Sequence, residues 1–131
     1  MCIRDSWNTP SLMTAIVCGW LQDGTVKRLE ILKRRDARQR QKIARELLKP
    51  HTIISHPCSY FIWLPLSEEV RAEYVVRQLM NENISVSTAE PFSTTQNVPH
   101  AIRLALGSVS LDDLKRALIK VRETLEYARY L

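Results

Sequence analysis

The spacing of the apolar residues changes near His56 in this 131-residue chain. Before it, residues 12–21 carry apolar side chains every three or four positions, and residues 26–48 carry a thinner stripe of the same kind; this is the period of an amphipathic helix. Residues 59–64 (SYFIWL) are instead aromatic and β-branched, and predict a strand that is buried on both faces. A chain with both periods has to pack helices against a sheet, so the fold class is α/β.

Two helices are expected before the change of period. Thr9 is a suitable helix cap, and Pro10 fits the first helical position, where its missing N–H is not needed. Gly24 suits the left-handed residue that follows a helix. The second helix is expected over residues 26–48, and Pro50 ends it.

Four further elements are expected after the first strand, which Pro65 ends. Ser67-Glu68-Glu69 predicts a capped helix, and residues 84–87 alternate as in a short strand. After a polar loop, an apolar strand over 101–106 precedes a final helix over 111–131. The predicted order is α-α-β-α-β-β-α, with the helices packed on a small sheet.

Several kinds of site have no support in the sequence. Three glycines, none in a phosphate-binding loop, argue against a nucleotide cradle, and no serine lies in a GxSxG elbow. His51, His56 and His100 are isolated, so we expect no metal site. The scattered cysteines favour a reducing, cytosolic compartment, and no apolar run reaches the ~18–20 residues of a membrane span.

Positive charge is concentrated in one segment. Residues 25–49 hold ten Lys and Arg against three Asp and Glu, whereas the rest of the chain carries a small net negative charge. Such a segment is either a nucleic-acid-binding face or the solvated face of a helix. The solvated face is favoured, because no aromatic side chain lies among the arginines.

Arg103 is a lone charge within the apolar strand IRLAL. It must be exposed at an edge, paired with an acid, or directed at an anionic ligand, because an unpaired buried charge is too costly. On the first strand, Phe61 and Trp63 share a face and either stack on bases or pack in the core, with core packing favoured. Cys58 is likewise expected to be a small packing residue rather than a nucleophile.

The first six residues, MCIRDS, match the translation of a transposon-end adapter used in sequencing libraries. We therefore expect residues 1–6 not to be native and the genuine sequence to begin near Trp7. On this expectation the chain is the tail of a longer protein.

The strings HPCSYFIWLPL, NISVSTAEPF and AIRLALGS, followed by a leucine-rich helix, resemble the C-terminal end of the MocR subfamily of GntR-type transcriptional regulators. These proteins fuse a winged-helix DNA-binding domain to a fold-type I aminotransferase-like domain that holds pyridoxal 5′-phosphate. The resemblance implies that residues 7–49 are long helices leading into a C-terminal small subdomain at residues 50–131. Cys58 and Ser59 depart from the small residues, often glycines, that are usual at their positions.

The resemblance assigns Arg103 to the carboxylate of an amino-acid substrate or effector. Phe92, on the loop before that strand, either lines the mouth of this site or packs within its loop, and loop packing is favoured. The resemblance places the winged helix, the phosphate-binding cup and the Schiff-base lysine upstream of this chain. It also implies a homodimer. None of the six lysines fits the Schiff-base role, since all lie on expected surface helices: Lys27, Lys33, Lys42, Lys49, Lys115 and Lys120.

The sequence leaves three hypotheses. The chain is the C-terminal part of an aminotransferase-like regulator that senses an amino compound or the cofactor and binds DNA through an upstream winged helix. Alternatively, it is the tail of a stand-alone aminotransferase. The third hypothesis is a basic α/β module that binds nucleic acid through residues 25–49.

Overall fold

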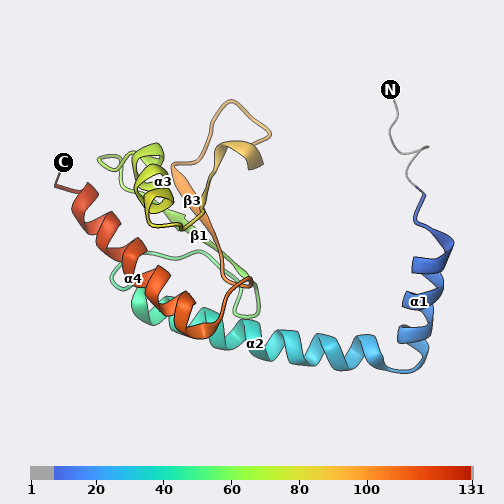
Figure 1. The fold of residues 1–131 in the computed structure, drawn as a ribbon. Coiled ribbons are helices and arrows are strands. Elements are labelled where there is room, and N and C mark those ends of the chain that lie inside the picture. Colours follow the sequence, from blue (N-terminus) through green and yellow to red (C-terminus); the bar gives the residue numbers. More distant parts are fainter. Residues whose placement is uncertain (1–7, 131) are drawn as a thin grey trace. The chain divides into compact units, whose positions relative to one another are not determined.

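The computed structural model describes residues 8–130 (Figure 1). The proposed adapter residues 1–6 and Trp7 lie outside the described residues. The chain forms two compact units, one up to Arg35 and one from Asp36 onward. The predicted division into residues 7–49 and 50–131 remains a prediction.

The first unit contains helix α1 (Ser11–Gln22) and the beginning of helix α2 (Thr25–Leu47). Gly24 lies between them with φ of +82°, as predicted for the residue after a helix. The predicted cap at Thr9 is wrong. Pro10 is itself the N-cap residue in an extended conformation, and no side chain caps the helix.

The second unit is built on a three-stranded antiparallel sheet in the order β1-β3-β2. Strand β1 is Phe61–Pro65, β2 is Ser87–Thr88 and β3, the central strand, is Ala101–Ala105. Helix α3 (Ala72–Asn81) separates β1 from β2, and helix α4 (Leu111–Ala128) follows β3. The predicted order of helices and strands is confirmed, with one short 3-10 helix, η2 (Glu90–Phe92), added after β2.

Helices cover one face of this sheet and form the core with it (Figure 1). Ile62 and Leu64 of β1 and Ile102 and Leu104 of β3 point into this core. They pack against buried residues of α3, of α4, of the end of α2 and of the turn after it, among them Ala44, Leu48, Val75, Leu79, Leu114, Leu118, Val121 and Leu125. The apolar stripe predicted for the last helix is therefore the stripe that α4 buries.

Two predicted boundaries are wrong. Ser67-Glu68-Glu69 does not cap a helix: the backbone turns there, with the Val70 N–H bonded to the Ser67 carbonyl, and α3 begins only at Ala72. The strand predicted over 84–87 is displaced to β2, since the Ile84 N–H bonds back to Leu79 at the end of α3. Local hydrogen bonds thus replace strand pairing at Ile84.

The prediction that the first strand is buried on both faces is also wrong. Burial alternates along β1: Ile62 and Leu64 are buried, whereas Phe61 and Pro65 are exposed. Phe61, Trp63 and Arg103 share the other face of the sheet, outside the core that α3, α4 and the end of α2 form, and they are exposed or half-buried. We call this face of the sheet the open face.

Candidate functional site

Arg103 is the middle residue of the central strand, and its side chain lies on the open face. Its register partners are Trp63 on β1 and Ser87 on β2, so it has a neighbouring strand on each side. The side chain is half-buried. Exposure at a sheet edge, one of the three alternatives left by the sequence, is therefore excluded.

Two aromatic rings surround the Arg103 guanidinium. Its Cζ lies 3.8 Å from the centre of the Phe61 ring and 4.7 Å from the centre of the Phe92 ring. Both distances are within the range of a cation–π interaction, which contributes about 0.5–2 kcal/mol. No hydrogen bond or ion pair joins this guanidinium to another residue of the range 8–130. Pairing with an internal acid, the second alternative, is thus not observed either.

The local sequence explains how the rings reach Arg103. Phe61 starts β1 opposite Ala105, two residues along from the Trp63–Arg103 pair, so alternation puts it on the same face as Arg103. Phe92 ends η2, which begins one residue after β2 and its Ser87–Arg103 pair. The structure thus brings the rings of Phe61 and Phe92 to Arg103, and the role of Phe92 at the mouth of a ligand site stays a prediction.

Phe61 is the site residue that the sequence analysis missed. Core packing was expected for it, but its side chain is 45% exposed. The reason is that residues 60–64 are apolar throughout, so the period-2 signal that separates the two faces of a strand is absent. Only the pairing of Trp63 with Arg103 identifies the open face.

Gln41, near the C-terminal end of α2, is hydrogen-bonded to the backbone at the start of β1. Gln41 Nε2 donates hydrogen bonds to the carbonyls of Ser59 (2.8 Å) and Phe61 (3.1 Å), and its Oε1 accepts one from Ser55 Oγ (2.8 Å). All the polar atoms of this buried side chain are therefore used, which fixes its orientation. The start of β1 is anchored by a side chain rather than by sheet pairing alone.

Arg40, also on α2, is hydrogen-bonded to the backbone that follows β3. It is 9% exposed, and its Nη1 donates to the carbonyls of Leu106 and Val109, both at 2.7 Å. Its Nε donates to Asp36 Oδ2 at 2.9 Å, and the Tyr60 hydroxyl donates to the same oxygen at 2.8 Å. Burial, together with this hydrogen bond to Asp36, raises the pKa of Tyr60. Arg40 is thus an internal residue, although the sequence places it in the basic run.

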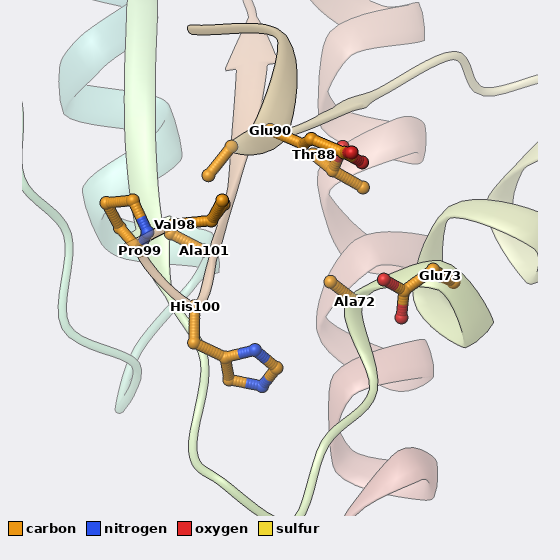
Figure 2. Close-up of a pocket in the computed structure, with 9 residues that line it drawn as sticks. Ala72, Glu73, Thr88, Glu90, Val98, Pro99, His100 and Ala101 are labelled. Atoms are coloured by element: carbon orange, nitrogen blue, oxygen red, sulfur yellow. The ribbon is translucent and has the colours of Figure 1, made fainter. Parts of the chain in front are cut away.

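A pocket of about 280 Å³ lies on another part of the unit (Figure 2). Figure 2 shows Glu73 and His100 on different sides of it, with Thr88 and Glu90 at one end. Neither Arg103 nor its two rings line this pocket. With two carboxylates and no Lys or Arg in its lining, it is a poor place for an anionic ligand.

The structure supports neither a core role for Cys58 nor a metal site among the residues that it describes. Cys58 is half-buried, and its Sγ accepts a long hydrogen bond (3.7 Å) from Arg38, so it is not the core residue that was expected. Among residues 8–130, no three His, Cys, Asp or Glu side chains are grouped to hold a metal ion. No helix in the same range is long and apolar enough to span a membrane.

The six lysines are all exposed. They lie on α2, on α4 or, for Lys49, in the turn after α2, and none lies on a strand. The described residues therefore do not by themselves fit a cofactor that requires a lysine in a strand-end pocket. What the open face does offer is a single guanidinium with free donor edges.

Comparisons with known proteins point to one fold. The chain matches no protein-family model and no curated protein. Among solved structures it is similar to the α-aminoadipate aminotransferase LysN of Thermus thermophilus, in complex with N-(5′-phosphopyridoxyl)-L-leucine, with a TM-score of 0.78 and 20% identity. That similarity covers 96% of this chain and 33% of LysN.

Two other aminotransferase structures are similar. An archaeal alanine:glyoxylate aminotransferase gives a TM-score of 0.69 at 21% identity, over 83% of this chain and 28% of that one. A multiple-substrate aminotransferase of Thermococcus profundus gives 0.68 at 14% identity, over 86% and 28%. The chain thus spans about a third of the length of the structures that it matches.

The chain has the fold of the C-terminal part of an aminotransferase, and its described residues form a small α/β domain with four α-helices and a three-stranded antiparallel sheet. The predicted fold class is confirmed. At these identities the similarity defines the fold alone.

Proposed function

We propose that this chain is the C-terminal part of a pyridoxal-phosphate-dependent, aminotransferase-like protein, in which Arg103 binds the carboxylate of an amino acid. The observation that carries the proposal is the Arg103 guanidinium on the open face, with two rings beside it and no anionic partner among residues 8–130. The likeness to aminotransferases over most of the chain supports it.

Arg103 would act by orientation. A planar guanidinium donates two parallel hydrogen bonds to a carboxylate, which fixes both the position and the direction of the ligand. Binding one end of an amino acid in this way presents its amino group at a defined place, which is a proximity effect and not a proton transfer. The cofactor would supply the reactive carbonyl, and the residues that hold it would belong to a part of the protein outside this chain.

The direct test is a titration of the full-length protein and its Arg103→Ala variant with amino acids. A charge-assisted hydrogen bond contributes about 1.5–3 kcal/mol, so the variant should bind about 10- to 150-fold more weakly. Equal affinity of a folded Arg103→Ala variant would refute the proposal.

The finer proposal is that the whole protein is a regulator of the MocR type, forms a homodimer and binds DNA through an upstream winged helix. The motifs of the strands and of the final helix support it. The rival is a stand-alone aminotransferase, which agrees with all three of the structural similarities reported. The full-length reading frame distinguishes them: a winged-helix domain upstream means a regulator, and its absence means an enzyme.

The basic module remains the third hypothesis. Arg40 is buried in hydrogen bonds to the chain itself, and Arg34 pairs with Glu30 at 2.7 Å, so fewer of the cations are free than the sequence suggests. In the proposed regulator, replacing Arg34, Arg35 and Arg38 by Ala should leave the preferred DNA sequence unchanged. Loss of that sequence preference would favour the basic module instead.

A further inference from the structure

We infer that Phe61 is a positioning residue, which holds the Arg103 guanidinium in place before a carboxylate arrives. The inference rests on the proposed function of Arg103. Neither the fold nor the proposed role of Arg103 by itself implies that the Phe61 ring orients the guanidinium. The short distance between the two groups, 3.8 Å from Cζ to the ring centre, is the starting observation.

Stacking and carboxylate binding use different parts of a guanidinium. The cation is planar, all five of its N–H donors point outward in its plane, and an aromatic ring contacts its flat face. Phe61 therefore fixes the plane of the Arg103 side chain without occupying a donor. Since no described residue takes these donors, they remain available to a ligand.

The benefit of such an arrangement is entropic. A long side chain that must be immobilised on binding costs about 0.5–1.5 kcal/mol, and a side chain that is already held does not incur this cost again. That range corresponds to an affinity about 2- to 12-fold higher. A ring beside Arg103 therefore strengthens carboxylate binding without touching the ligand.

Phe61 is better suited to this role than Phe92. Its ring is closer to Arg103, and its backbone is held three times: its carbonyl accepts from Gln41, its N–H donates to Ser59 Oγ at 3.0 Å, and it pairs with Ala105 in the sheet. Phe92 ends a three-residue 3-10 helix, and its N–H is bonded only locally, to the Ala89 carbonyl at 3.0 Å, so its backbone is not tied to the sheet as that of Phe61 is.

The test measures dissociation constants of the full-length protein by calorimetry. The probe is the tightest-binding compound among the twenty standard amino acids and L-2-aminoadipate, and its counterpart is the corresponding amine that lacks the α-carboxylate. Phe61→Leu should weaken binding of the amino acid about 2- to 12-fold and leave binding of the amine unchanged. Phe61→Tyr, which keeps a ring, should restore the affinity.

A double-mutant cycle separates this role from packing. In an Arg103→Ala background, Phe61→Leu should have no further effect, because no guanidinium remains to be held. The matched control is Tyr127→Leu, which removes an exposed ring from α4, away from the open face. It should not change either dissociation constant.

The outcomes separate the two claims. If Arg103→Ala weakens amino-acid binding but Phe61→Leu does not, the positioning role is wrong and the proposed function stands. A Phe61→Leu effect that persists without Arg103, or that extends equally to the amine, assigns Phe61 to packing or direct ligand contact. If no amino acid binds, or Arg103→Ala binds as tightly as wild type, the proposed function itself is wrong.

Discussion

Arg40 donates a 2.7 Å hydrogen bond to the carbonyl of Leu106, a residue 66 positions further along the chain. Leu106 directly follows β3, so this bond ties the second helix to the end of the central strand. The same Nη1 also bonds to Val109, one residue before the N-cap of α4, Ser110. One buried guanidinium thus closes the turn between the strand of Arg103 and the last helix.

Replacing Arg40 should therefore destabilise the domain strongly. Arg40→Leu leaves two carbonyls without their donor and removes the ion-pair partner of Asp36, for an expected loss of about 3 kcal/mol. Urea denaturation of the chain measures it. Lys42→Leu, at an exposed position on the same helix, is the matched control and should change stability by less than about 0.5 kcal/mol. Equal stability of the two variants would contradict the assignment of Arg40.

Arg103→Lys should recover only part of the binding lost in Arg103→Ala. An ammonium keeps the charge but cannot form the planar pair of hydrogen bonds. Esterifying the ligand should weaken binding to the wild type, and should add little to the effect of Arg103→Ala, because both changes remove the same contact. Titrations of the full-length protein with an amino acid and its methyl ester measure both effects. Additive losses would mean that the carboxylate binds elsewhere.

His51 should make stability depend on pH. Burial lowers its pKa; nearby Glu126 opposes this, and Arg129 and Arg122 add to it, while the buried Nε2 has no hydrogen-bond partner. The unfolded chain therefore takes up a proton more readily than the folded one. Stability should be highest above the ordinary histidine pKa of 6.5 and fall as the pH drops from there towards the lower pKa of the folded state.

Chemical denaturation at pH 7.5 and at pH 5 tests this dependence. His51→Gln should reduce the fall in stability between the two conditions, since glutamine does not titrate. Thr52→Gln, at an exposed neighbour that does not titrate, serves as the control and should keep the full dependence. A pH dependence that is identical in the wild type and His51→Gln would show that other groups cause it.

The chain alone should not attach pyridoxal 5′-phosphate at one defined lysine. All six lysines are exposed on helices or in a turn, so none has the desolvated setting that activates a lysine as a nucleophile. After incubation with the cofactor and borohydride reduction, peptide mapping should show low labelling spread over several lysines. Stoichiometric labelling of a single lysine would contradict this expectation.

Helix α1 should make the isolated chain associate. It has no charged residue and no buried residue, and Leu12 and Trp20 are 72% and 46% exposed. Exposed apolar surface of this kind favours association and dye binding. Replacing Leu12, Ile16 and Trp20 by Gln should lower both, as measured by analytical ultracentrifugation and dye fluorescence. A wild-type chain that is monomeric and binds no dye would refute the prediction.

Local patterns in the sequence were sufficient for the order of elements and for most of the core. The stripe Leu114, Leu118, Val121 and Leu125 has helical spacing, and α4 buries all four residues. Gly24 also follows from local chemistry, since its positive φ favours a residue without Cβ. Arg103 stood out as a charge among apolar neighbours, which is a feature of five consecutive residues.

Other features depend on contacts between distant segments. The sequence of residues 25–49 gives no sign that Arg40 differs from the arginines around it. The carbonyls that Arg40 binds lie in a turn far along the chain. Phe61 and Ile62 are both apolar neighbours on one strand, yet one is exposed beside Arg103 and the other is buried. Side-chain type and spacing determined which elements form. The pairing of β1 with β3 and the packing of helices on one face alone decided which residues surround Arg103, because a strand that is apolar throughout does not specify which of its faces is covered.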